Sequence, residues 1–153
     1  MMKLETRMLM ALQLLADPPP APLIKTPSGD RLIMPIKGGD FYGERLKGIV
    51  RPNGADWILN RPDGTTVLDV RITLETSDNQ LIYCQYRGLR HGKKEALEAI
   101  ERGEPVDTSD YYMRTSLQFE TGSEKYYWMN NIIAVATGDR KPAGPIYYVF
   151  EVL

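Results

Sequence analysis

The sequence is poor in the residues that most often bind metals or form covalent cross-links. It has one cysteine, Cys84, and one histidine, His91. A single cysteine excludes an intrachain disulfide, and a zinc site usually takes three or four ligands from His, Cys and carboxylates. A Cys–His nucleophile pair is not expected, because the two residues lie close in sequence across a predicted strand end. Within "LIYCQY", Cys84 is expected to be a small, buried hydrophobic residue.

The chain also lacks an excess of charge of either sign. Its 19 Lys and Arg residues are balanced by 20 Asp and Glu residues, which leaves a formal net charge of −1. Binding to nucleic acid or to an anionic membrane normally uses a broad basic surface. We therefore expect neither nucleic acid nor a membrane as a partner.

Long apolar runs and phosphate-binding glycine motifs are missing as well. The segment "MLMALQLLA", residues 8–16, is too short to cross a bilayer, and "DPPPAP" follows it instead of a small-residue cleavage site. "GGDFYG" and "HGKKEA" lack the glycine spacing of dinucleotide- or phosphate-binding loops. These features predict a cytoplasmic protein without a cofactor, and the length of 153 residues fits a single domain over 1–153.

The sequence does contain a regular series of turns and strand-like segments. Turn signals recur at "PSGD" (27–30), "KGGD" (37–40), "RPNGAD" (51–56), "RPDGT" (61–65), "SDNQ" (77–80) and "GDRKPAGP" (138–145). Segments rich in β-branched and aromatic residues lie between them, among them "VLDVRITLE", "LIYCQYRG", "YYMRTSLQFE" and "YYWMNNIIAVAT". Many short strands joined by tight turns indicate an all-β sandwich or barrel.

Two segments differ from this pattern. "GKKEALEAIERGE", residues 92–104, is the one segment that reads clearly as a helix, with apolar residues on one side and charges opposite. "LETRMLMALQLL", residues 4–15, fits either a long first strand or a helix, because periodicity alone does not separate the two.

Polar and apolar residues alternate along two predicted strands. In 68–76 the aliphatic residues Leu68, Val70, Ile72 and Leu74 alternate with Asp69, Arg71, Thr73 and Glu75. In 111–121 the residues Tyr112, Arg114, Ser116, Gln118 and Glu120 alternate with Tyr111, Met113, Leu117 and Phe119. Successive side chains of a strand point to opposite faces, so each polar set shares one face. That face is either exposed to solvent and crossed by weak ion pairs, or it lines a cavity for a small ligand.

Several multi-residue motifs resemble those of one protein family. They occur in the order "GGDFYGERLKGIVRPNGADW", "RPDGTTVLDVRITLET", "RHGKKE", "YYMRTSLQFETG" and "YYWMNNIIAVATG". Together they resemble the domain-of-unknown-function 3237 family, also called uncharacterised protein family 0311, from residue 5 to the end. The resemblance implies a single antiparallel β-barrel with a central cavity. With the turn spacing, this predicts an up-and-down barrel of about eight to ten strands.

The resemblance favours the cavity interpretation, because its motifs combine charged groups with tryptophans. The motifs fall on Asp56, Trp57, Asp69, Arg71, Arg114, Glu120, Trp128 and Asn130. We expect Arg71 and Arg114 to hold an anionic oxygen of a substrate. Asp69 or Glu120 would act as general base, and Tyr112 would donate a proton or a hydrogen bond. These residues are predicted to form one cluster inside the barrel with Trp128.

The remaining candidates would bind substrate or move a proton. Asp56, Trp57, Trp128, Asn130 and Arg90 are the predicted substrate-binding residues. Trp128 would stack on an aromatic substrate, whereas Trp57 is equally well a core residue and Asp56 a turn residue that bonds backbone. His91 is either a general base at the rim of the cavity or a turn histidine next to the helix.

Three classes of function remain open. The first is a cofactor-independent isomerase, cyclase or lyase that moves a proton on a small carbonyl-bearing or aromatic molecule. The second is a lipocalin-like carrier of a small molecule, and the third is a structural or interaction protein. The enzyme is favoured because burying Arg and carboxylate groups is costly for a passive carrier. A homodimer is also expected, since the aliphatic side chains of 68–76 would need cover if the interior were polar.

Overall fold

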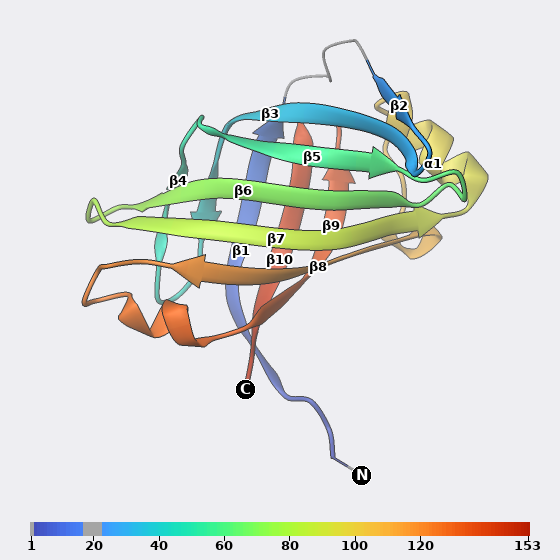
Figure 1. Cartoon of the computed structure of the whole chain (residues 1–153). Coiled ribbons are helices and arrows are strands. Elements are labelled where there is room, and N and C mark those ends of the chain that lie inside the picture. Colours follow the sequence, from blue (N-terminus) through green and yellow to red (C-terminus); the bar gives the residue numbers. More distant parts are fainter. Residues whose placement is uncertain (1, 17–22) are drawn as a thin grey trace.

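The computed structural model describes residues 2–16 and 23–153. Within these ranges the chain forms ten strands that belong to one antiparallel sheet (Figure 1). The strands are β1 (Thr6–Ala16), β2 (Ile24–Thr26), β3 (Gly29–Tyr42), β4 (Lys47–Val50), β5 (Gly54–Asn60), β6 (Thr66–Thr76), β7 (Leu81–Gly92), β8 (Tyr111–Glu120), β9 (Ala134–Lys141) and β10 (Gly144–Val152).

The sheet closes into an eight-stranded barrel. Its order runs β1-β10-β9-β8-β7-β6-β4-β3, and β1 also pairs with β3, which completes the ring. β5 takes the same position as β4 between β3 and β6, and β2 adds a short strand beside β3. The predicted all-β antiparallel barrel is confirmed. The N-terminal segment, for which strand and helix were both open, is strand β1.

Two glycines allow β3 to bend around the barrel. Its first half pairs with β5, from Asp30 to Ile36, and its second half pairs with β4, from Gly39 to Tyr42. Gly38 and Gly39 lie where the two halves meet and have φ of +149° and +147°, a region that glycine favours. The segment "KGGD" is therefore a bend inside a long strand, and the turn predicted there is wrong.

Helices are few and short in the described residues. They are α1 (Lys94–Glu101), the 3-10 helix η1 (Thr108–Asp110) and the 3-10 helix η2 (Tyr127–Asn131). α1 falls within the predicted helix 92–104. η2 interrupts the segment 126–137, so its prediction as one continuous strand is wrong, and β9 begins only at Ala134. No helix in 2–16 or 23–153 is long and apolar enough to cross a membrane.

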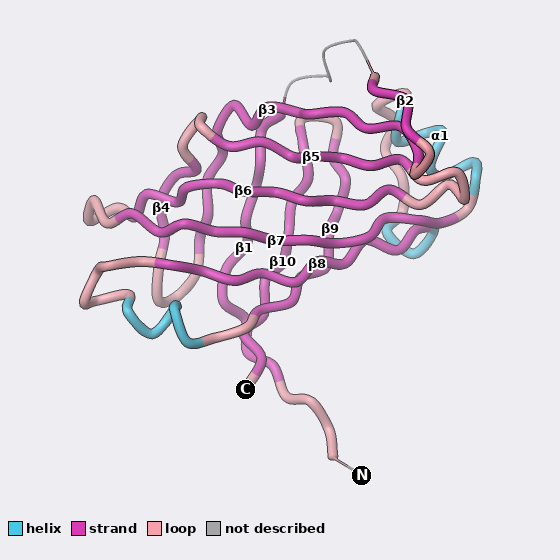
Figure 2. Tube along the Cα trace, in the orientation of Figure 1, coloured by secondary structure: helices cyan, strands magenta, loops and turns pink. Residues whose placement is uncertain are grey.

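α1 and η2 lie at opposite ends of the barrel (Figure 2). α1 follows the end of β7 and η2 follows the end of β8, and these two strands run antiparallel. At the η2 end, Tyr126 and Met129 are buried in the apolar core. The α1 end contains the hollow part of the interior.

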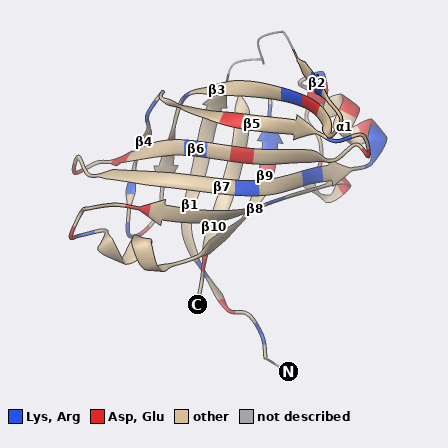
Figure 3. Cartoon of the chain, viewed as in Figure 1, with Lys and Arg blue, Asp and Glu red and all other residues tan. Residues whose placement is uncertain are grey.

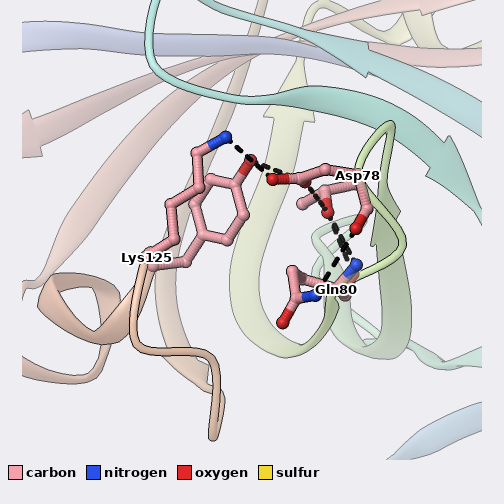
Figure 4. A network of polar contacts seen from close by, with 5 residues as sticks. Asp78, Gln80 and Lys125 are labelled. Atoms are coloured by element: carbon pink, nitrogen blue, oxygen red, sulfur yellow. Dashed lines mark hydrogen bonds and ion pairs between the residues drawn. The ribbon is translucent and has the colours of Figure 1, made fainter.

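Asp78 in the β6–β7 turn anchors the segment before η2 (Figure 4). Its carboxylate accepts hydrogen bonds from Thr76 Oγ1 at 2.6 Å, Lys125 Nζ at 2.8 Å and Tyr126 OH at 2.9 Å. The hydrogen bond from Lys125 is the largest cause that holds the pKa of Asp78 well below its ordinary value. These bonds hold the segment before η2 against the β6–β7 turn.

The inward faces of β6 and β8 are apolar. On β6 the buried side chains include Leu68, Val70 and Leu74, and on β8 they include Met113 and Leu117. The aliphatic face of 68–76 thus fills the interior. These side chains leave no outward aliphatic face on β6 for a partner subunit to cover, and the homodimer stays a prediction.

Candidate functional site

A cavity of about 570 Å³ opens inside the α1 end of the barrel. Its size falls in the range of small-molecule sites. Apolar side chains form much of its wall, including Leu14, Leu32, Ile36, Ile58, Leu68, Val70 and Met113. Polar side chains also face it, namely Asp56, Asn60, Thr66, Tyr86, Arg90, Arg140 and Tyr147, and residues 100–104 and 140–142 contribute to its lining.

Asp56 on β5 enters the cavity at an interruption of the β5–β6 ladder. The paired residues are Ala55↔Arg71 and Asp56↔Val70, and pairing resumes only at Leu59↔Val67. In the gap, the backbone N–H of Asp69 donates to Asp56 Oδ1 at 3.0 Å, and Arg31 Nη1 donates to the carbonyl oxygen of Trp57 at 2.9 Å. Side chains thus satisfy backbone groups that a regular ladder would pair, and the Asp56 carboxyl is held in place.

The carboxyl of Asp56 is poised to exchange a proton near neutral pH. Burial raises its pKa from the ordinary 3.8 to about 6, and the negative charge of Asp69 adds to this rise. The hydrogen bond from the Asp69 N–H and the charge of Arg90 oppose it. A carboxyl with such a pKa is suited to general acid/base chemistry.

Two arginines face the same cavity without a carboxylate partner. Burial is the main cause that lowers the pKa of both Arg90 on β7 and Arg140 on β9, and the charge of Arg140 adds to the effect on Arg90. Arg90 Nη2 lies 3.5 Å from Thr66 Oγ1, and the Arg140 guanidinium donates to the Lys141 carbonyl oxygen. No ion pair to either arginine is present in the described part of the chain. Since arginine stays protonated in proteins, both contribute positive charge to the cavity.

Two buried tyrosines complete the polar part of the cavity. The rings of Tyr86 and Tyr147 pack edge to face, with centroids 5.2 Å apart and an interplanar angle of 62°. Burial raises the pKa of both phenols well above the ordinary value, so both are neutral hydrogen-bond donors. The Tyr86 hydroxyl is buried and has no hydrogen-bond partner among the residues described.

The arrangement combines a base, two cations and phenol donors around an apolar space. It fits the abstraction of a proton by Asp56 with stabilisation of a developing oxyanion by Arg90 or Arg140. In the described residues no group of three or more His, Cys, Asp or Glu side chains forms a potential metal site.

The structure places Asp56 and Arg90 in the cavity, but Asp69 and Arg71 lie on the outer wall. The cavity contacts their neighbours Leu68 and Val70 instead. The Arg71 guanidinium lies 5.0 Å from the centroid of the Trp57 ring and 3.7 Å from Asp69 Oδ1. Figure 3 shows charged positions along β5, β6 and β7. The prediction that Asp69 and Arg71 point inward is wrong, because they alternate with the buried aliphatic residues and therefore lie on the opposite face of β6.

The predicted residues of β8 also lie outside the cavity. Tyr112, Arg114 and Glu120 share the exposed face of β8, and buried Met113 and Leu117 occupy the other face. The Arg114 guanidinium lies 5.0 Å from the Tyr112 ring centroid.

His91 belongs to the same outer surface. Its ring stacks on Tyr112, with centroids 4.9 Å apart, and its side chain is exposed. Its expected position at the rim of the cavity is wrong, because β7 continues to Gly92 and turns His91 away from the interior.

Trp128 and Asn130 lie on η2, at the far end of the barrel from the cavity. The Arg45 guanidinium lies 4.0 Å from the centroid of the Trp128 ring. The Asn130 side chain accepts from the Thr121 N–H at 2.8 Å and donates to the Thr121 carbonyl at 2.9 Å. Both residues hold the η2 segment, so their predicted place beside the other candidates is wrong.

Sequence reasoning missed Arg140, Tyr86 and Tyr147. Tyr86 could have been identified from the sequence. It lies two positions after the apolar Cys84 and four positions before Arg90 on the same strand, so the three side chains share one face. Arg140 was hidden in the segment "GDRKPAGP", which is predicted as a turn but continues β9 as far as Lys141.

A family described as "Protein of unknown function (DUF3237)" matches residues 3–152. A UPF0311 protein of Rhodopseudomonas palustris strain CGA009 is 37% identical over 126 residues, which cover 82% of each chain. A UPF0311 protein of Bradyrhizobium diazoefficiens is 39% identical over 129 residues, which cover 84% of each.

Solved structures share the fold. A conserved protein of unknown function from R. palustris superposes with a TM-score of 0.94 at 32% identity over 100% of both chains. A "beta-barrel like protein" from Acinetobacter baumannii gives a TM-score of 0.82 at 36% identity, covering 99% of this chain and 97% of the other. A protein from Penicillium herquei, described as an enzyme, gives 0.71 at 19% identity over 98% and 95%, which shows the fold alone.

Proposed function

Since this chain belongs to the protein family of unknown function DUF3237, we propose a function from the chemistry of its cavity. The protein is an enzyme that uses its own side chains for acid/base catalysis on a small carbonyl-bearing or aromatic molecule. Asp56 acts as the general base, Arg90 and Arg140 stabilise the oxyanion, and Tyr86 donates a hydrogen bond.

One observation carries this proposal. A buried carboxyl whose pKa is raised to about 6 shares a largely apolar cavity with two guanidinium groups that have no carboxylate partner among the described residues. Burying an unpaired charge costs several kcal/mol. An apolar guest would gain little from such groups, whereas a reaction that develops negative charge would gain much.

The expected reaction is a proton transfer. The Asp56 carboxylate takes a proton from the carbon next to a carbonyl group. The electron pair of that C–H bond forms a C=C bond, and the π electron pair of the C=O bond moves to the carbonyl oxygen. Arg90, Arg140 and the Tyr86 hydroxyl surround the resulting enolate oxygen. As the carbonyl re-forms, the protonated Asp56 returns the proton to another atom of the enolate, which gives an isomer. Alternatively, the bond from the β-carbon to a leaving group breaks and Asp56 protonates that group, which gives an elimination product.

The fold supports the same proposal by analogy. The related P. herquei protein is described as an enzyme, so this barrel is compatible with catalysis. One fold hosts many functions, so the side chains of the cavity, and not the fold, support the proposed chemistry.

Proton exchange tests the proposal without knowledge of the natural substrate. The protein is incubated in D₂O with a panel of small ketones, β-diketones and phenols, and deuterium incorporation is followed by NMR. We expect at least one class to exchange faster than in buffer, and Asp56→Asn to lower that rate by about 100-fold or more. Asp40→Asn, which changes an exposed carboxylate on β3, is the matched control. Exchange that is equal in Asp56→Asn and wild type contradicts the role of Asp56.

The second candidate function is a lipocalin-like carrier. The closed barrel and the apolar side chains that line much of the cavity favour it. A carrier would bind its ligand in Asp56→Asn with affinity close to that of the wild type and would catalyse no exchange.

A further inference from the structure

We propose that the cavity binds an organic monoanion, with a mostly apolar body of ring size and one acidic oxygen group that Arg90 and Arg140 hold. This inference rests on the proposed function in that it names the substrate class for the same cavity. It concerns binding alone, so it can be tested separately from turnover.

The charges that face the cavity set the charge of the ligand. The charged residues that line the cavity are the cations Arg90, Arg102, Arg140 and Lys141 and the carboxylates Asp56, Glu101 and Glu104, which leaves an excess of one positive charge when Asp56 is ionised. Arg102 is paired with Glu104, whereas Arg90 and Arg140 make no ion pair in the described residues. The positive charge of Arg140 weakens the hold of Arg90 on its proton, which indicates that the two guanidinium groups repel one another. A single negative charge on the ligand balances the remaining excess and removes much of this repulsion.

Unpartnered donors show what kind of atom the ligand presents. Arg90 Nε and the Tyr86 hydroxyl are both buried without a hydrogen-bond partner among the described residues. Tyr86 is only 1% exposed and lines the cavity. Buried donors are normally satisfied, and leaving one unpaired costs about 1–3 kcal/mol. Oxygen acceptors on the ligand, as in a carboxylate, a phenolate or an enolate, would satisfy both.

The rest of the cavity sets the size and polarity of the ligand body. Its volume of about 570 Å³ corresponds to roughly 19 water molecules at ~30 Å³ each. Leu32, Ile58 and Met113 are among the apolar side chains around this space. An inorganic anion would leave most of this apolar surface without contact, so an organic body is required.

Calorimetry with three probes tests the charge requirement on the unmodified protein. The probes are 2-naphthoate, its uncharged analogue 2-naphthamide, and inorganic phosphate. We expect 2-naphthoate to bind with a dissociation constant below about 1 mM, and both other probes to bind at least about tenfold more weakly. Equal affinity for the acid and the amide, tighter binding of phosphate, or no binding of 2-naphthoate below about 1 mM overturns the proposal.

Variants then locate the anion. Arg90→Gln and Arg140→Gln should each weaken 2-naphthoate by about tenfold or more and change 2-naphthamide by less than about twofold. Arg87→Gln, on the exposed face of the same strand as Arg90, should leave both probes unchanged. Unchanged binding of 2-naphthoate in both cavity variants overturns the assignment. The wild-type probe comparison decides the question if a variant does not fold.

The two proposals fail in different ways. Asp56→Asn should abolish deuterium exchange but retain 2-naphthoate binding, because it removes the base and a repelling charge and leaves both arginines. Selective binding of 2-naphthoate that depends on the arginines, without exchange of any panel compound, supports the anion site and contradicts the catalytic role. Exchange that depends on Asp56, together with equal binding of 2-naphthoate and 2-naphthamide, supports the catalytic role and contradicts the anion site.

Discussion

The backbone N–H of Asp69 donates a hydrogen bond to the side chain of Asp56 at 3.0 Å. The two aspartates are therefore hydrogen-bonded neighbours on the adjacent strands β5 and β6, although only Asp56 lines the cavity. The bond orients the Asp56 carboxyl, and the negative charge of the Asp69 side chain disfavours ionisation of that carboxyl. An outer-wall residue thus influences the proton affinity of a group inside the barrel.

Asp69→Asn should lower the pKa of Asp56. The substitution removes a neighbouring negative charge and keeps the backbone N–H that holds the Asp56 carboxyl. Carboxyl ¹³C NMR titration should show the Asp56 midpoint below its wild-type value of about 6. Glu75→Gln, farther along the same face of β6, is the control and should leave the midpoint unchanged. A midpoint that stays or rises in Asp69→Asn would show that the charge of Asp69 does not reach Asp56.

Asp56 should make the free energy of unfolding depend on pH. Its pKa is raised on folding from 3.8 to about 6, so its stabilising contribution is full below pH 3.8 and is lost as the pH rises through 6. The difference in unfolding free energy between wild type and Asp56→Asn should fall by ~3 kcal/mol over this window, at 1.36 kcal/mol per pH unit of pKa change. Urea denaturation at a series of pH values measures it. A constant difference between pH 4 and pH 7 would contradict the raised pKa.

Tyr86→Phe and Tyr111→Phe should change stability in opposite directions. The Tyr86 hydroxyl is buried without a partner among the described residues, so its removal should raise the unfolding free energy by ~1 kcal/mol. The Tyr111 hydroxyl accepts from the Arg140 N–H at 2.8 Å and donates to Asp139 at 3.4 Å. Its removal should lower the unfolding free energy by ~1 kcal/mol.

Chemical denaturation of the two variants provides the measurement, and each is the control for the other. If Tyr86→Phe is less stable than the wild type, the Tyr86 hydroxyl makes a stabilising hydrogen bond, which contradicts its unpaired state. A gain in stability together with weaker 2-naphthoate binding would identify this hydroxyl as a group kept for the ligand.

Gly39→Ala should destabilise the barrel at the β1–β3 seam. Gly39 has a φ of +147°, and a Cβ atom there would lie 2.0 Å from the carbonyl oxygen of Gln13 on β1. The strands would have to separate, at a cost of ~3 kcal/mol or more, visible as a lower denaturation midpoint. Gly122→Ala adds a Cβ with nothing within 4 Å and should have little effect. Equal midpoints for the two variants would contradict the close approach of β1 and β3.

Sequence patterns predicted the strands of the barrel well because alternation is a local property. The parity of 68–76 correctly separates Leu68 and Val70 from Asp69 and Arg71. Alternation does not tell which of the two faces of a strand is enclosed, since that depends on how distant strands close the barrel. Here the aliphatic face is inside, as the burial of apolar surface favours, and the charged face is outside.

The cavity was harder to predict than the strands because its polar groups come from five different strands. Asp56 and Arg90 were among the candidate residues, and the structure brings them to one cavity. Their neighbour Arg140 is separated from Arg90 in sequence by α1, η1, β8 and η2, and no local pattern links the two. The interruption of the β5–β6 ladder that holds Asp56 also depends on Arg31 from a third strand, which periodicity does not reveal.

The closure of the barrel by β1 and β10 has a consequence for folding. Their ladder runs from Thr6↔Val152 to Gln13↔Ile146, and the side chains of Arg7 and Glu151 pair across 144 positions of sequence. Contacts this distant are slow to form, because the entropy of loop closure is lost before their hydrogen bonds are gained. Without the β1–β10 ladder the strands form an open curved sheet with β1 and β10 as unpaired edges, the kind of surface on which chains aggregate. The joining of β1 to β10 therefore both encloses the cavity and removes the edges that promote aggregation.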